Sequence, residues 1–146
     1  MTRGPMTDAG LARLKLDESF RGNPYDDATG IRCHAKGNVT VGYGRNLDAE
    51  PFTEAEALAW MVDRLVMRWA DLCIYEPWLP TINPVWRDVV LNVDYNTGNA
   101  LTYPHMLAAM ERGDAAGAAA NCTVRNAILQ ARYGRMAAAI LAGSWR

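Results

Sequence analysis

The sequence predicts a mostly helical α+β fold with one short β region near the N-terminus. Apolar residues recur at helical spacing along most of the chain, whereas residues 39–43 alternate large apolar side chains with Thr40 and Gly42. The 146 residues, 50% of them hydrophobic and 21% charged, suffice for one domain with a buried core. We therefore expect a single globular domain over residues 1–146.

Composition and charge argue against several classes of protein. The net charge of −1, with both signs interspersed, provides no basic surface for nucleic acid or for a membrane. We find no signal-peptide core at the N-terminus, and no apolar run approaches the ~20 residues of a membrane span. Three scattered cysteines, Cys33, Cys73 and Cys122, are typical of reduced thiols. We expect a monomer made in the cytoplasm, with no nucleic-acid partner and no membrane insertion.

The first expected helix is capped by Thr7 or Asp8 and carries a carboxylate on its inward stripe. Leu11, Leu14 and Glu18 stand at i, i+3 and i+7, so Glu18 continues the apolar face. Partial loss of solvent disfavours the charged form of a carboxyl group and raises its pKa. Such a pKa is typical of a general acid.

The β region is expected to be a hairpin that follows a turn. The helix stops before residues 22–24, residues 25–30 read as a turn, and residues 31–34 and 39–43 form two strands joined by residues 35–38. The alternation places Thr40 on the face opposite the large apolar side chains, where a substrate could lie. Gly42 and Gly44 leave the backbone open to close approach.

Helix start and stop signals divide the rest of the chain. A capping box from Thr53 to Glu56 predicts a long amphipathic helix that ends at Pro77. Two helices are expected next, one from Asn83-Pro84 to Gly98 and one from Pro104 to Gly113. Asp114 is expected to cap a further helix, and residues 123–142 should form one or two more.

The most informative residues combine two carboxyl groups with a hydroxyl on a glycine-bounded strand. Glu18 and Asp27 are separated by eight residues, and the strand reads Thr40-Val41-Gly42-Tyr43-Gly44. One carboxyl group can protonate a leaving oxygen while the other directs a water. This pattern resembles the phage-type lysozymes, the muramidase endolysins that cut bacterial peptidoglycan. Segments 92–98, 104–114, 130–135 and 142–145 also resemble that family.

The resemblance implies a lysozyme-like fold with a substrate cleft. A small β-hairpin lobe would span about residues 19–52, and a larger helical lobe would span about residues 53–146 together with the N-terminal helix. The implied reaction hydrolyses, with inversion, the β-1,4 bond between N-acetylmuramic acid and N-acetylglucosamine, for host cell lysis. Its partner is the peptidoglycan glycan strand, and no metal or cofactor is needed.

The resemblance also implies roles for particular residues. Glu18 would be the general acid, Asp27 would direct the water, and Thr40 would help hold that water. The C-terminal helix would supply Arg132 to pair with Glu18, and we expect Arg135 to pair with Asp17. The residues expected to bind substrate or support the site are Tyr43, Arg45, Asn46, Tyr95, Asn96 and Arg132.

Several alternatives stay open on the sequence. Asp26 stands beside Asp27, although the spacing favours Asp27 as the catalytic residue. The long stretch 28–39 either lengthens the hairpin or reaches over the cleft. Two other functions compete with hydrolysis, that of a lytic transglycosylase and that of an inactive peptidoglycan-binding module. Reaching the cell wall would need a holin-like pore or delivery within a larger particle.

Overall fold

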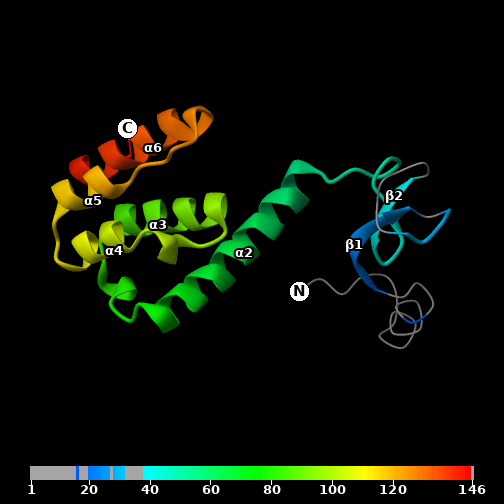
Figure 1. Ribbon diagram of the computed structural model, residues 1–146. Coiled ribbons are helices and arrows are strands. Elements are labelled where there is room, and N and C mark those ends of the chain that lie inside the picture. Colours follow the sequence, from blue (N-terminus) through cyan, green and yellow to red (C-terminus); the bar gives the residue numbers. More distant parts are fainter. Residues whose placement is uncertain (1–15, 17–19, 27, 32–37, 146) are drawn as a thin grey trace. The chain divides into compact units, whose positions relative to one another are not determined.

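The computed structural model describes residues 16, 20–26, 28–31 and 38–145, and it is α+β and mostly helical, as predicted. The chain divides into two compact units, an N-terminal unit (Met1–Leu58) and a C-terminal unit (Ala59–Arg146). Figure 1 shows the strands of the former and the helices of the latter. Of the predicted N-terminal helix, only Leu16 lies within the described residues, and it is helical.

A three-stranded antiparallel sheet forms the regular part of the N-terminal unit. Its strands β1 (Arg21–Asp26), β2 (Val39–Gly42) and β3 (Arg45–Asn46) lie in the order β1-β2-β3, so β2 is central. Gly44, with φ of +80°, lies in the tight turn between β2 and β3, a backbone conformation that glycine adopts without strain. The predicted strand at residues 39–43 is therefore confirmed, except that Tyr43 belongs to the turn.

The strand that pairs with β2 differs from the prediction. Residues 25–30 were expected to be a turn and residues 31–34 a strand, yet β1 begins at Arg21 and includes Tyr25. Ile31 lies outside the strand, and residues 32–34 lie outside the described part of the chain. Between the pairs Arg21↔Gly42 and Tyr25↔Thr40, β1 advances four residues and β2 only two. This irregularity accommodates the segment around Pro24, which cannot donate to a regular ladder.

The helices begin and end close to the predicted residues. They are α2 (Glu54–Tyr75), α3 (Pro84–Thr97), α4 (Pro104–Glu111), α5 (Ala115–Asn121) and α6 (Ala127–Ala142), with short 3₁₀ turns at Leu79–Thr81 and Ala100–Thr102. The capping box of α2 is confirmed, because Glu56 N–H donates to Thr53 Oγ1 over 3.2 Å and Thr53 N–H donates to Glu56 over 2.9 Å. Gly98 ends α3 in the left-handed conformation.

The hydrophobic core of the described chain lies in the C-terminal unit. Helix α4 packs against α5, α5 packs against α6, and α6 runs beside α3 (Figure 1). The α3–α6 contact includes a hydrogen bond of 3.1 Å from Trp86 Nε1 to the Ile140 carbonyl. The larger side chains that are almost fully buried are Leu79, Val89, Val90, Val93, Met106, Tyr133, Met136 and Ile140. This core gives α3 and α6 fixed positions from which to present side chains.

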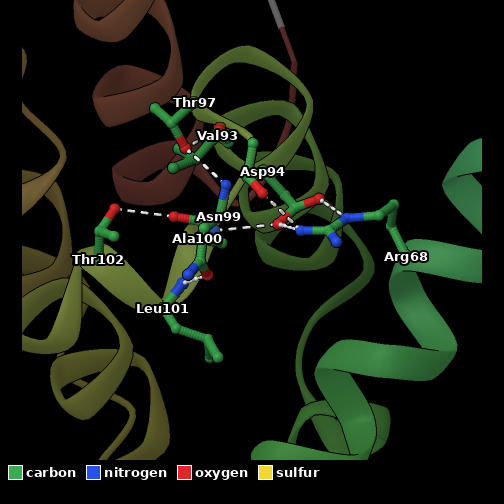
Figure 2. A network of polar contacts seen from close by, with 9 residues as sticks. Arg68, Val93, Asp94, Thr97, Asn99, Ala100, Leu101 and Thr102 are labelled. Atoms are coloured by element: carbon green, nitrogen blue, oxygen red, sulfur yellow. Dashed lines mark hydrogen bonds and ion pairs between the residues drawn. The ribbon is translucent and has the colours of Figure 1, made fainter.

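A partly buried ion pair joins α2 to the end of α3. Figure 2 shows Arg68 donating to both carboxylate oxygens of Asp94, over 2.7 and 2.8 Å, while Ala100 N–H donates to the same carboxylate. Arg68 also donates to the Gly98 carbonyl over 2.7 Å. Burial alone would raise the pKa of Asp94, but the hydrogen bonds from Arg68 and Ala100 outweigh it and hold that pKa below its usual value. The pair therefore fixes the backbone where α3 ends.

Candidate functional site

Thr40 is the member of the predicted catalytic group that the structure describes, because Glu18 and Asp27 lie outside the described residues. It occupies the middle of the central strand, paired with Tyr25 on β1 and with Asn46 on β3. Only 4% of Thr40 is exposed, which makes it more buried than its neighbours Val39 and Val41. The alternation placed Thr40 on the face opposite the large apolar side chains; the structure shows this face covered at Thr40, and its contact with substrate stays a prediction. Alternation separates the two faces of a strand but does not say which face is covered.

The hydroxyl of Thr40 is buried without a hydrogen-bond partner among the residues that the structure describes. An unpaired buried hydroxyl costs roughly 1–3 kcal/mol, so such a group is unusual in a folded protein. A hydroxyl has one donor and two acceptor lone pairs. Thr40 Oγ1 can therefore bind a water and a carboxylate at the same time.

Asp26 has a structural role at the end of β1. Its Oδ1 accepts hydrogen bonds from Ala28 N–H over 2.9 Å and from Thr29 N–H over 3.3 Å, which is an Asx turn. Its backbone continues the same turn, because Gly30 N–H donates to the Asp26 carbonyl over 2.8 Å. The Asp26 carboxylate, which is itself buried, therefore holds the chain that leaves the strand.

The predicted supporting residues of the N-terminal unit fall into two kinds. Tyr43 is exposed at the β2–β3 turn, and its ring lies 5.3 Å from that of Phe20 between centroids. Arg45 and Asn46 bind their own chain, because the Arg45 guanidinium contacts residues 50–56 and the Asn46 side-chain oxygen accepts from Asp48 and Ala49 N–H. Tyr43 thus presents an aromatic surface, while the other two shape the loop after β3.

A hollow of about 340 Å³ in the C-terminal unit brings together two predicted residues, Tyr95 and Arg132. Arg132 Nε donates to Asn92 Oδ1 over 2.8 Å, which fixes the guanidinium against α3. The lining is part apolar and part polar, and it consists of Met61, Leu65, Asp88, Leu91, Asn92, Tyr95 and Arg132. Mixed linings of this kind suit ligands with one apolar face and several polar groups.

Asn96 does not join this hollow, although the sequence grouped it with Tyr95. Its Nδ2 donates over 3.3 Å to the hydroxyl of Tyr133, which is buried and also accepts from Tyr103 over 3.1 Å. Burial, together with this contact to Tyr133, raises the pKa of Tyr103 to about 12. Asn96 therefore belongs to a polar network beside the core, and its expected role in binding substrate or supporting the site stays a prediction.

Asp88 and Asn92 line the hollow and were not predicted. They stand seven and three residues before Tyr95 on α3, so the three side chains share one face of the helix. Met61 and Leu65 stand four residues apart on α2, so their side chains also share one face of their helix. Helical spacing from Tyr95 would have indicated both polar residues.

The two arginines of α6, Arg132 and Arg135, line different hollows. Arg135 lines a separate hollow of about 490 Å³ at the end of α6, together with Ala138 and Ala142. The carboxylates proposed to pair with Arg132 and Arg135, Glu18 and Asp17, lie outside the described residues. The two expected ion pairs therefore stay predictions.

No protein-family model matches the chain, and no curated protein matches it. In the described part of the chain, no group of three or more His, Cys, Asp or Glu side chains could hold a metal ion. The described helices include none that is both long enough and apolar enough to span a membrane.

Proposed function

We propose that this protein is a muramidase with a lysozyme-like fold, which hydrolyses the β-1,4 bond between N-acetylmuramic acid and N-acetylglucosamine in peptidoglycan. The observation that carries the proposal is the order and spacing of Glu18, Asp27 and the strand from Thr40 to Gly44. The position of Thr40 supports it, since a central strand holds a threonine hydroxyl that has no partner among the described residues.

The proposed mechanism uses two carboxyl groups and one water. Glu18 protonates the glycosidic oxygen as the bond to the anomeric carbon breaks, and positive charge develops on the sugar ring. Asp27 takes a proton from a water that attacks the opposite face of the ring. Inversion follows if the carboxyl groups stand roughly 6.5–9.5 Å apart, which leaves room for that water.

Thr40 would orient the attacking water. Its hydroxyl can donate to the Asp27 carboxylate and accept from the water, which uses the hydrogen-bonding capacity left open among the described residues. Because β2 pairs with a strand on each side, the position of this hydroxyl is held by backbone hydrogen bonds. Fixed geometry of this kind lowers the entropic cost of reaching the transition state.

Binding of the glycan would use exposed aromatic and polar side chains. Tyr43 offers a ring on which the apolar face of a sugar can stack. In the C-terminal unit, the hollow beside Tyr95 and Arg132 has a volume in the lower part of the range typical of ligand sites. Asp88 and Asn92 there would bind hydroxyl or acetamido groups. A holin-like pore, or delivery within a larger particle, would bring the protein to the wall for host cell lysis.

Mass spectrometry of digested peptidoglycan tests the proposal. Wild type should release muropeptides with reducing ends, and Glu18→Gln and Asp27→Asn should release none. Asp26→Asn is the matched control, because asparagine keeps the oxygen that accepts from Ala28 and Thr29 N–H. Anhydro-ended products would indicate a lytic transglycosylase instead. Glycan binding without cleavage, unchanged in Glu18→Gln, would indicate a binding module.

A further inference from the structure

The guanidinium of Arg45 lies at the junction between the sheet and α2. It donates to both carboxylate oxygens of Glu56, over 2.7 and 3.0 Å, and to the backbone carbonyls of Glu50 and Pro51, each over 2.9 Å. Its flat face lies over the ring of Phe52, 4.6 Å from the centroid. One side chain therefore holds the connecting segment at three residues and the first turn of the helix at a fourth.

The backbone of Arg45 belongs to β3 and pairs with Val41 on β2, next to the pair between Asn46 and Thr40. The loop that follows is also bound to β2: Leu47 N–H donates to the Val39 carbonyl over 2.7 Å, and Val39 N–H donates to the Asp48 carboxylate over 2.8 Å. The connecting segment thus contacts β2 at its start and α2 at its end, with Arg45 common to both contacts.

Glu56 serves two purposes at the start of α2. Its carboxylate accepts from the backbone N–H and the hydroxyl of Thr53, each over 2.9 Å, as well as from Arg45. These hydrogen bonds, with Arg45 the largest cause, lower the pKa of Glu56 to about 2. The helix cap and the ion pair therefore form one unit that is fully charged at neutral pH.

We propose that Arg45 is a positioning residue, which holds β2 and the Thr40 hydroxyl in a fixed relation to the first turn of α2. The side chains of Arg45 and Glu56 are 27% and 46% exposed. An exposed ion pair adds little to global stability, so the effect of Arg45 is expected in local geometry. Only the enzymatic consequence rests on the proposed muramidase function; the structural consequence does not.

The test uses the full chain with Arg45→Gln, Arg45→Lys and Glu56→Gln. Hydrogen exchange of the Val39, Leu47 and Glu50 amides, all bonded in this junction, should accelerate about tenfold in Arg45→Gln and in Glu56→Gln. On peptidoglycan, both variants should lower kcat about tenfold and leave KM within about twofold. Arg45→Lys keeps the charge but loses the forked geometry, so it should recover part of the loss.

Arg64→Gln is the matched control. Arg64 lies on α2, and its guanidinium, like that of Arg45, lies over an aromatic ring, 5.1 Å from the centroid of Trp60. The variant therefore loses the same charge and a similar ring contact. It should leave the exchange rates and kcat at wild-type values. Circular dichroism at matched concentration verifies that every variant is folded.

Several results would overturn the positioning role. Unchanged exchange in Arg45→Gln would do so, and so would faster exchange with unchanged kcat in an active enzyme. A raised KM at constant kcat, absent from Glu56→Gln, would instead mean that Arg45 contacts the glycan. If wild type cleaves no peptidoglycan, the muramidase proposal fails by itself, and the exchange rates still decide whether Arg45 fixes β2.

Discussion

Replacing Asp94 by asparagine tests the ion pair that joins α2 to α3. The substitution keeps the size of the side chain and removes its charge. One carboxylate oxygen becomes an NH₂ group, and whichever oxygen is replaced, that group faces a donor, because Arg68 occupies both oxygens and Ala100 N–H shares one of them. Asp94 is 1% exposed, so water cannot replace the lost contacts.

The expected loss follows from the geometry of the pair. Removing one partner of a fully buried ion pair costs about 3–5 kcal/mol. The Arg68 side chain is 35% exposed and regains part of its hydration, so we expect a smaller loss of about 2 kcal/mol in the free energy of unfolding. For a chain of this length, that loss lowers Tm by roughly 4–8 °C.

Urea unfolding at pH 7, followed by tryptophan fluorescence, measures this loss. Asp71→Asn is the control, because Asp71 is an exposed acidic residue on α2 that acts on Arg68 only through charge; it should change stability by less than about 0.5 kcal/mol. The pKa of Asp94 is lower in the folded protein than in the unfolded chain. The stabilisation by its charged form is therefore complete above the unfolded-state pKa and is lost as the pH falls from there through the folded-state pKa. The difference in the free energy of unfolding between wild type and Asp94→Asn should therefore become smaller below about pH 4. A loss below about 0.5 kcal/mol at pH 7 would refute the reasoning.

Three further predictions concern the sheet and the hollow. Thr40→Val removes a buried hydroxyl at nearly constant shape, so stability should stay equal or rise while kcat falls about tenfold or more; falling stability with constant kcat would assign Thr40 a structural role. NMR titration should give the Glu56 carboxyl a pKa of about 2, below its ordinary pKa of 4.5. Its contribution to stability is therefore complete above pH 4.5 and is lost as the pH falls from 4.5 to 2. A titration midpoint near pH 4.5 would disprove the Arg45 contact in solution. Tyr95→Ala should raise KM for peptidoglycan about fivefold, whereas Tyr75→Ala, which alters a different hollow, should not; equal effects would remove Tyr95 from glycan binding.

Helix boundaries could be predicted from the sequence because their causes are local. Thr53 and Glu56 cap α2 across three residues, and Asn83, Gly98 and Asp114 act within one turn of the helix ends that they define. The central strand was also predicted, since alternation is a property of consecutive residues.

Pairings between distant residues could not be predicted in the same way. Arg21 opposes Gly42, and the prediction treated the segment around Pro24 only as a break, although an irregular ladder accommodates it. Arg68 and Asp94 are 26 residues apart, and no local pattern connects them. Such contacts follow from the packing of whole elements.

The candidate site shows the same division between local and distant information. The resemblance to phage-type lysozymes placed Tyr95 and Arg132 among the functional residues, and both line one hollow. It could not separate Asn96, which turns toward Tyr133, from its neighbour. Nor could it distinguish an arginine that binds substrate from one that binds its own chain, as Arg45 does.

Cleavage of peptidoglycan in water enriched in ¹⁸O tests the central claim most directly. A hydrolase transfers the oxygen of water to the anomeric carbon of N-acetylmuramic acid, so each new reducing end should gain 2 Da, and none should form with Glu18→Gln. Products without the label, or anhydro-ended fragments, would contradict the proposed hydrolysis.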